Sequence, residues 1–256
     1  IGYYADFHEK MTTYVRILSA PAEALDPHST ARTFPVICTE EGKSPFQYED
    51  TATSRAGIAV VTGKLCGWKI GIIGLGGTGS YVLDLVAKTP VEEIHLYDGD
   101  RYSQHNAFRS PGAWSLAELG EKKKKATNFV DIYSKLRRKG LSGQDEALTA
   151  ENLHLLEGIN FAFLCMDGGK SKKAIVDWLI AQEVPFIDVG MGIVRSPNGL
   201  QGILRVLTST PDKRDHIDRL MSFASDDEAE NEYATNIQIA ELNALNAALA
   251  VIRWKR

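Results

Sequence analysis

The chain has 256 residues, of which 44% are hydrophobic and 24% are charged, and its formal net charge at pH 7 is -4. That length allows one substantial core plus an appended segment, and the acidic balance argues against a nucleic-acid partner. Three scattered cysteines, Cys38, Cys66 and Cys165, do not make a disulfide framework or a zinc pair. No apolar run approaches the roughly 20 residues of a membrane span. We therefore expect a cytoplasmic protein that does not insert into a membrane.

The first fifty residues differ in character from the rest of the chain. They carry scattered prolines and weak periodicity, as in "SAPAEALDPHSTARTFP", which is typical of irregular structure or of part of a small extra domain. We therefore predict that residues 1–50 are an N-terminal extension or the remnant of an extra domain, and that residues 51–256 form the main domain. Because the first residue is Ile, we also expect that the chain has been trimmed at its beginning.

After this boundary, short β-rich runs alternate with amphipathic stretches. The expected strands are 68–74, 91–100, 159–167, 185–191 and 201–209. The expected helices are 54–67, 80–90, 121–140, 172–184 and 236–254, of which the second ends at Pro90 and the third at Gly140. This alternation predicts an α/β fold, with a Rossmann-like, doubly wound and mostly parallel sheet that has helices on both faces.

A glycine-rich turn, "GLGGTG", lies between the first expected strand and the helix that follows it. Its glycines are Gly74, Gly76, Gly77 and Gly79. They allow a tight turn and a close approach of the backbone to phosphate, while the helix N-terminus offers N–H groups and a partial positive charge. Asp98 ends the next strand and is placed to bind ribose hydroxyls. The turn alone predicts a nucleotide site and does not distinguish ATP from NAD.

The residues after Asp98 make that distinction. The stretch "DGDRYSQHNAFR" supplies a second carboxylate, Asp100, an amide, Asn106, and a guanidinium, Arg109. At this point the sequence resembles the ThiF/MoeB-type adenylyltransferases, the superfamily of ubiquitin-activating enzymes. The resemblance rests on a GxGGxG turn, an acidic pair, an Asn and an Arg three apart, a lysine in "EKKKKA", and Asp167 in "LCMDGGKSKK". These elements follow in the family's order over residues 55–256.

The resemblance implies ATP- and Mg²⁺-dependent adenylation of the C-terminal carboxylate of a ubiquitin-like protein, with release of pyrophosphate. It assigns Asp98 to the ribose, Asn106 and Arg109 to the phosphates and Asp167 to Mg²⁺, and it makes Asp100 part of the nucleotide site. Catalysis of phosphoryl transfer depends mainly on alignment and on neutralisation of the phosphate charge, which suits these side chains. The expected product is an acyl adenylate.

Two further positions follow from the resemblance. For the lysine, the distance from Gly120 favours Lys123, whereas the apolar phase of the helix favours Lys125, and we choose Lys125. Arg55 corresponds to an arginine that reaches into the partner subunit's ATP site in the family, which implies a homodimer with shared active sites. An ordinary surface arginine is the alternative for Arg55.

The sequence also departs from the thioester-forming members of the family. The segment "TSTPDKRDHIDRLMSFASDDEAENEY" contains no cysteine, and we interpret Cys66 and Cys165 as small core residues. We therefore expect the reaction to stop at the adenylate, with direct transfer to a partner. An oxyester on Ser209 or Thr210 is an alternative.

The stretches "IIGLGGTGSYVLDLVAKTPVEEIHLYDGD" and "HNAFRSPG" resemble bacterial ThiF-family proteins with an additional N-terminal domain. Those proteins are encoded with ubiquitin-like and conjugating-enzyme-like partners, so the resemblance implies a ubiquitin-like conjugation or sulfur-carrier pathway. Two other classes stay open: an NAD(P)-binding Rossmann oxidoreductase and a catalytically inactive ThiF-like scaffold. The oxidoreductase leaves Arg109 and Asp167 without a purpose, and the inactive relatives normally lack one of these residues.

Overall fold

A computed structural model describes residues 3–27, 29, 44–48, 50, 62–197, 199–221, 223 and 238–256. The chain divides into two compact units. One comprises Ile1–Thr39 and Asp50–Val60, and the other comprises Glu40–Glu49 and Val61–Arg256. Each unit is described by itself, and the functional boundary near residue 50 stays a prediction. In the described part of the chain, no helix combines the length and the apolar character that crossing a bilayer requires.

The described part of the first unit is dominated by one helix, α1 (Phe7–Leu25). The sequence indicated irregular structure or part of a small extra domain for residues 1–50. The first alternative was wrong for this stretch, and the second stays a prediction. The side chain of Asp6 accepts a hydrogen bond of 2.7 Å from the main-chain N of Glu9 and so caps the helix, while Pro21 lies inside it. A proline inside a helix removes a backbone hydrogen bond and so masks the helix in the sequence, whereas an aspartate at the cap position favours a helix start.

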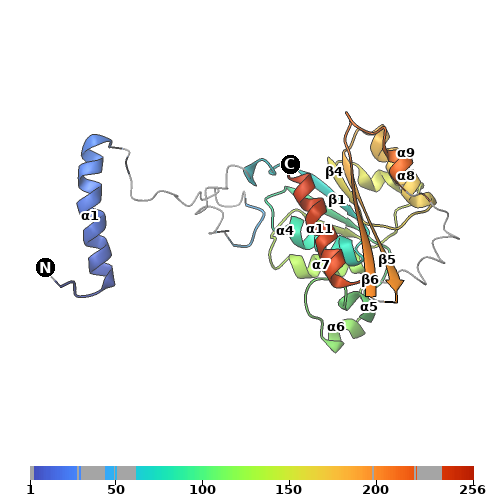
Figure 1. The fold of residues 1–256 in the computed structure, drawn as a ribbon, viewed down its shortest axis with the longest axis horizontal. Coiled ribbons are helices and arrows are strands. Elements are labelled where there is room, and N and C mark those ends of the chain that lie inside the picture. Colours follow the sequence, from blue (N-terminus) through green and yellow to red (C-terminus); the bar gives the residue numbers. More distant parts are fainter. Residues whose placement is uncertain are drawn as a thin grey trace. The chain divides into compact units, whose positions relative to one another are not determined.

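The second unit is built on a six-stranded sheet with the order β3-β2-β1-β4-β5-β6 (Figure 1). The strands are β1 (Lys69–Ile73), β2 (Glu93–Tyr97), β3 (Leu141–Gln144), β4 (Phe161–Leu164), β5 (Phe186–Ser196) and β6 (Gly199–Ser209). Strands β1 to β5 are parallel, and β6 runs antiparallel to β5 as the second arm of a long hairpin. This confirms the predicted α/β fold with its mostly parallel, doubly wound sheet.

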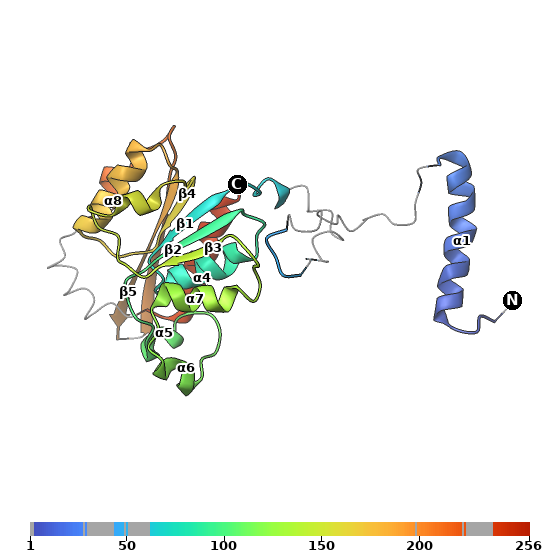
Figure 2. The ribbon, with the colours of Figure 1, turned by 180° about the vertical axis from the view of Figure 1, so that it is seen from behind.

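Helices cover both faces of this sheet, as Figures 1 and 2 show. The helical elements are α4 (Gly77–Ala87), α5 (Gln104–Ala107), α6 (Leu116–Gly120), α7 (Lys125–Tyr133), the 3-10 helix η1 (Leu153–Leu156), α8 (Lys170–Ala181), α9 (Ile217–Leu220) and α11 (Ala240–Trp254). One apolar cluster joins α4, α7 and α11 to the sheet, and a second joins η1, α8 and α9 to the opposite face. The two layers bury the central strands β1 and β4 most completely, which is why those two strands are apolar runs.

Two elements differ from their sequence-based predictions. Helix α7 ends at Tyr133, although the apolar pattern predicted a helix up to Gly140. The chain turns after Tyr133 so that the buried guanidinium of Arg137 can donate to main-chain carbonyls at the C-terminal end of α4. Strand β3 was not predicted, because "LSGQ" is short and polar and lies at the edge of the sheet. The expected helix 54–67 lies mostly outside the described residues.

Candidate nucleotide site

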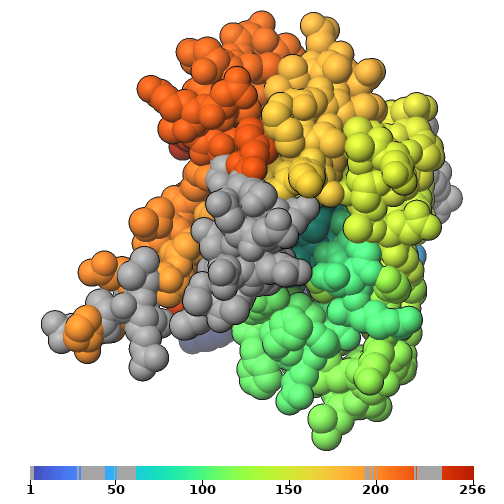
Figure 3. All heavy atoms as spheres, turned by 90° about the vertical axis from the view of Figure 1, so that its right-hand side faces the viewer, coloured from blue at the N-terminus to red at the C-terminus, as the bar shows by residue number. Residues whose placement is uncertain are grey.

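A cavity of about 490 Å³ opens at the carboxyl ends of β1, β2 and β4. The sheet order changes direction there, because the chain crosses from β1 to β2 on one side and β4 adds to β1 on the other. Doubly wound sheets bind their ligands at this switch point. Figure 3 shows the face, on which blue-green atoms that follow β1 lie in a hollow between the yellow atoms around α8 and the green atoms that follow β2.

The first and last glycines of the turn are required by close contacts beneath the cavity. Gly74 has a φ of 88°, and a Cβ there would lie 2.7 Å from the main-chain oxygen of Cys165. A Cβ on Gly79 would lie 1.9 Å from the oxygen of Gly74, so the start of α4 could not pack against the turn. Gly74 lines the cavity, whereas Gly79 supports it from behind.

The two glycines between them, Gly76 and Gly77, lie at the N-terminus of α4. A Cβ on Gly76 would meet nothing within 4 Å, and the residue lines the cavity, so a ligand can approach its backbone closely. A Cβ on Gly77 would lie 2.0 Å from Nδ2 of Asn243 on α11, whose Oδ1 accepts a hydrogen bond of 2.9 Å from Thr78. Among the described residues, no side chain caps the first turn of α4, which leaves its N–H groups for an anion.

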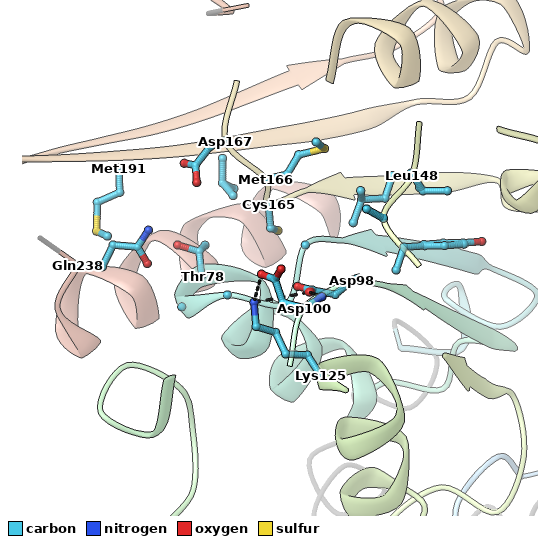
Figure 4. A pocket seen from close by; sticks show the side chains of 18 of the residues that line it. Thr78, Asp98, Asp100, Lys125, Leu148, Cys165, Met166, Asp167, Met191 and Gln238 are labelled. Atoms are coloured by element: carbon cyan, nitrogen blue, oxygen red, sulfur yellow. Dashed lines mark hydrogen bonds and ion pairs between the residues drawn. The ribbon is translucent and has the colours of Figure 1, made fainter. Parts of the chain in front are cut away.

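Asp98 is held rigidly at the end of β2. Its Oδ2 accepts a hydrogen bond of 2.6 Å from the N–H of Leu75, and its Oδ1 accepts one of 2.9 Å from the N–H of Asp100. Lys125 places its Nζ 2.6 Å from Oδ2 of Asp100 and 3.5 Å from Oδ1 of Asp98. Figure 4 shows these three side chains together on one side of the cavity. The arrangement keeps a nearly buried cation, 7% exposed at its side chain, beside the glycine turn.

The start of α7 explains which lysine reaches the cavity. Lys125 is the first residue of the helix, and its N–H donates to the oxygen of Asp100 at 2.9 Å. Lys123 instead forms ion pairs of 3.2 and 3.0 Å with Glu121 and Asp131. Lys125 lines the cavity and Lys123 does not, so the structure places the lysine chosen from helix phase in the site. Its role toward a ligand stays a prediction.

The segment after β2 contributes Asn106, Arg109 and His105. Oδ1 of Asn106 accepts hydrogen bonds of 2.9 Å from the N–H and from the hydroxyl of Ser103 and so caps α5, and Asn106 does not line the cavity. Its buried Nδ2 has no partner among the described residues. Arg109 lines the cavity, and its buried Nε likewise has no partner there. His105 also lines the cavity, and burial, reinforced by Arg109 and Lys125, lowers its pKa.

Asp167 follows β4 on the other side of the cavity from Lys125 (Figure 4). It is exposed, and within the described ranges no hydrogen bond or ion pair holds its carboxylate. Those ranges also contain no group of three His, Cys, Asp or Glu side chains that could hold a metal ion by themselves. Asp167 is therefore a free carboxylate at the rim of a cavity that also presents two cations.

The structure changes the interpretation of two cysteines. Cys66 is exposed in the turn before β1, so its interpretation as a core residue was wrong. Cys165 directly follows β4 and is partly buried, but it also lines the cavity. Burial, with the nearby Asp188 carboxylate, raises the pKa of its thiol, so it is held as a neutral thiol. Cys38 and Arg55 lie outside the described residues.

Sequence reasoning missed the residues that form the two ends of the cavity. Leu148 lies at one end, and Met191 and Gln238 lie at the other (Figure 4). Met191 lies in β5 beyond Asp188, the last residue that pairs with β4, and it ends the strand expected from the sequence, so a strand-end search could have found it. Leu148 follows β3, which was not predicted, and therefore had no signal.

The sequence model of the ThiF family matches residues 53–253. The chain belongs to the ThiF family. This confirms the family that the turn, the acidic pair and the Asn, Arg, Lys and Asp positions indicated. Residues 1–51 match a separate family described as a domain of unknown function, DUF6791. Among curated proteins, no significant sequence match was found.

Solved structures show the same ThiF-type fold. Escherichia coli MccB with ATP is 19% identical, with a TM-score of 0.58 over 81% of this chain and 63% of that one. The microcin C7 biosynthetic enzyme MccB in complex with N-formylated MccA is 18% identical, with a TM-score of 0.59 over 77% and 58%. PaaA is 15% identical, with a TM-score of 0.60 over 94% and 82%. This chain thus spans less than two thirds of the two MccB chains, and identities this low show the fold alone.

Proposed function

We propose that this ThiF-family chain uses ATP to adenylate the C-terminal carboxylate of a ubiquitin-like protein. The pathway would be a bacterial pathway of ubiquitin-like protein conjugation or of sulfur transfer by a carrier protein. The observation that carries the proposal is the convergence of Arg109, Lys125, Asp98 and Asp167 on one cavity with the glycine turn. A hydride-transferring enzyme needs the turn and the ribose carboxylate, but it has no use for two cations and a free carboxylate around the phosphate position. Those groups suit cleavage of a triphosphate.

The lining of the cavity supports one direction for a bound ATP. One end is apolar, with Leu148, Tyr97 and Met166, and accepts the adenine base. Asp98 lies between this end and the glycine turn, and its oxygens each accept one main-chain hydrogen bond. Because a carboxylate oxygen can accept more than one hydrogen bond, Asp98 can still receive the ribose hydroxyls. The phosphates then follow Gly76 and the open N-terminus of α4.

The two cations act on the phosphates in different ways. Arg109 has no partner to give up, since its Nε is buried without a hydrogen bond among the described residues. Lys125 is shared between Asp98 and Asp100, and a bound phosphate competes with the exposed Asp100 for it. Both cations would neutralise the charge that develops on the phosphate oxygens as pyrophosphate leaves. Asn106 can add a donor only through Nδ2, because its Oδ1 caps α5.

The residues present fit a magnesium ion that arrives with ATP. Asp167 offers an unpaired carboxylate at the cavity, and Mg²⁺ in such sites takes one or two carboxylates together with phosphate oxygens and water. When bound, the ion would supply charge neutralisation and alignment of the phosphates. Asp167 is the residue that would hold it.

The reaction follows from this placement. A carboxylate oxygen of the protein substrate attacks the α-phosphorus, the bond from that phosphorus to the bridging oxygen of the β-phosphate breaks, and pyrophosphate leaves with the electron pair. The acyl adenylate forms near Met191 and Gln238, at the end of the cavity opposite the base. Ser209 is 0% exposed, so its hydroxyl gives no support to an oxyester intermediate. A nucleophile of a partner protein, such as a conjugating-enzyme-like protein, would take the acyl group.

Similar folds add support for a nucleotide and a protein substrate, since MccB structures were solved with ATP and with MccA. We also propose a homodimer in which Arg55 completes the partner's site. Mixing an Arg55→Ala variant with an Asp167→Ala variant tests this, because shared sites restore activity in the mixture. No restored activity would leave Arg55 as a surface residue.

Exchange of labelled pyrophosphate into ATP tests the proposed function. We expect exchange that depends on a ubiquitin-like protein and disappears when its C-terminal carboxylate is replaced by an amide. Calorimetric titrations with ATP and with NAD provide the matched comparison. Binding of NAD without binding of ATP would replace the proposal with the oxidoreductase. Binding of ATP without exchange, for every candidate ubiquitin-like protein, would favour the inactive scaffold.

A further inference from the structure

Three charged side chains form an ion triad behind one wall of the cavity, and the side chain of its third member, Arg205, is 34% exposed. Nζ of Lys172 on α8 lies 2.5 Å from Oδ1 of Asp188 on β5, and Nη2 of Arg205 on β6 lies 2.8 Å from Oδ2 of the same carboxylate. The side chains of Lys172 and Asp188 are 3% and 0% exposed. None of the three lines the cavity. Removing one partner from such a buried group is costly, because it leaves a charge unpaired.

Lys172 connects the triad to the loop between β4 and α8. Besides its contact with Asp188, its Nζ donates a hydrogen bond of 3.3 Å to the main-chain oxygen of Met166. Met166 directly precedes Asp167, and the helix that carries Lys172 begins three residues later, at Lys170. In the part of the chain that the structure describes, no side chain caps α8, whose N-cap is Gly169. The lysine therefore reaches back across its own helix start and holds the loop on which Asp167 lies.

Asp188 and Arg205 connect the triad to the neighbouring wall. Asp188 directly precedes Val189 and Gly190, and both of these line the cavity. Arg205 packs against Gly190, where a Cβ would lie 3.0 Å from its Nη2. Nη1 of Arg205 also donates to the oxygen of Leu220 at 3.2 Å, which ties the end of α9 to the same group. The triad thus fixes two adjacent walls of the site relative to each other.

We propose that the triad of Lys172, Asp188 and Arg205 is a positioning device for the Asp167 carboxylate. Asp167 itself has no hydrogen bond or ion pair with the described residues, so its position depends on how its loop is held. The triad holds that loop through Met166 and so sets where Asp167 meets the divalent cation that accompanies ATP. This inference rests on the proposed function. Groups that orient a metal ligand without touching the metal have large effects on affinity.

Binding of a non-hydrolysable ATP analogue, measured by calorimetry with and without Mg²⁺, tests the role of the triad. In Lys172→Met we expect the Mg²⁺-dependent part of the affinity to fall roughly tenfold, with little change in binding without Mg²⁺. Lys172→Arg keeps the charge and should retain the wild-type dependence. The matched control is Arg137→Met, which removes another buried cation at the opposite end of α4. It should lower thermal stability and leave the effect of Mg²⁺ unchanged.

A second variant and a second readout keep the test decisive if Lys172→Met does not fold. Arg205→Met leaves the pair of Lys172 and Asp188 in place and should give a smaller change in the same direction. Amide hydrogen exchange at residues 166–170 should become faster in either variant, while the glycine turn keeps its rate. Equal Mg²⁺ dependence in the wild type and in both variants overturns this inference alone. A wild type that binds no nucleotide overturns the proposed function, and the inference with it.

Discussion

Arg109 and Arg137 lie at opposite ends of helix α4 and differ in their hydrogen bonds. Arg137, 2% exposed, donates to the main-chain oxygens of Ala87, Thr89 and Val91 at 3.2, 2.8 and 2.6 Å. Arg109 lines the cavity at the N-terminal end of the helix, and its buried Nε has no partner among the described residues.

The difference separates a charge that completes the fold from one that we propose acts on a ligand. The carbonyls at a helix C-terminus attract a cation, so Arg137 completes the fold although burial lowers its pKa to about 10. The N-terminus of a helix attracts an anion and offers only N–H donors, so it provides no acceptor for a cation that lies beside it. Arg109 is therefore placed to share an anion with α4, and the two ends of one helix show both uses of its dipole.

Substituting Arg109 should have the largest effect on activity. We expect Arg109→Ala to reduce the exchange of pyrophosphate into ATP by about 100-fold or more, because it removes a donor aimed at the transferring phosphate. Its melting temperature should stay near that of the wild type, since no described contact is lost. Unchanged exchange would remove Arg109 from the site.

Substituting Arg137 should have the opposite pattern. We expect Arg137→Ala to lower the free energy of unfolding by about 3 kcal/mol or more, because three buried carbonyls lose their donor. Urea denaturation followed by circular dichroism measures this loss. The activity per folded molecule should remain, and a specific loss of activity without a loss of stability would contradict the comparison.

Gly77 provides a smaller test at the same end of α4 as Arg109. A Cβ there would lie 2.0 Å from Asn243, so Gly77→Ala should cost about 1–3 kcal/mol of stability through overpacking. Asn243→Ala removes the obstructing amide, so the double variant should recover part of the loss. A double-mutant cycle by urea denaturation measures the coupling. Purely additive effects would mean that the two residues do not compete for the same space.

The smallest effect is expected for His105 and concerns pH. Burial and the charges of Arg109 and Lys125 lower the pKa of its imidazole, while Asp100 opposes them. The unfolded chain therefore takes up this proton at higher pH than the folded chain does, so the stabilisation is complete above the unfolded pKa of about 6.5 and is lost as pH falls below it. His105→Asn should flatten the pH dependence of the melting temperature between about pH 7 and pH 5. An unchanged profile would show that His105 titrates as it does in the unfolded chain.

The sequence predicted the central strands of the parallel sheet well because these strands are buried on both faces. Runs such as "WKIGIIG" and "INFAFLCMD" need no partner to be recognised, since their residue types alone indicate a buried strand. The polar edge strand β3 and the early end of α7 depend on tertiary contacts. The first is stabilised by pairing with β2, and the second by the carbonyls that Arg137 caps.

The site could be predicted where its functional side chains directly follow strand ends. The prediction failed where the arrangement of a side chain depends on contacts between residues far apart in the sequence. Asp98 and Asp167 directly follow expected strands, so their convergence could be anticipated. Lys125, which helix phase favoured, lines the cavity, and its action on a ligand stays a prediction. No pattern shows that Asn106 uses its oxygen to cap α5, or that a lysine, an aspartate and an arginine far apart in sequence meet behind the cavity.

Exchange of labelled pyrophosphate into ATP by the wild-type chain tests the central claim most directly. With a ubiquitin-like protein that ends in a free carboxylate, we predict label in ATP, and with the same protein ending in a C-terminal amide we predict none. Label that appears equally with both forms, or that appears with neither although the chain binds ATP, would contradict adenylation of a protein carboxylate at this site.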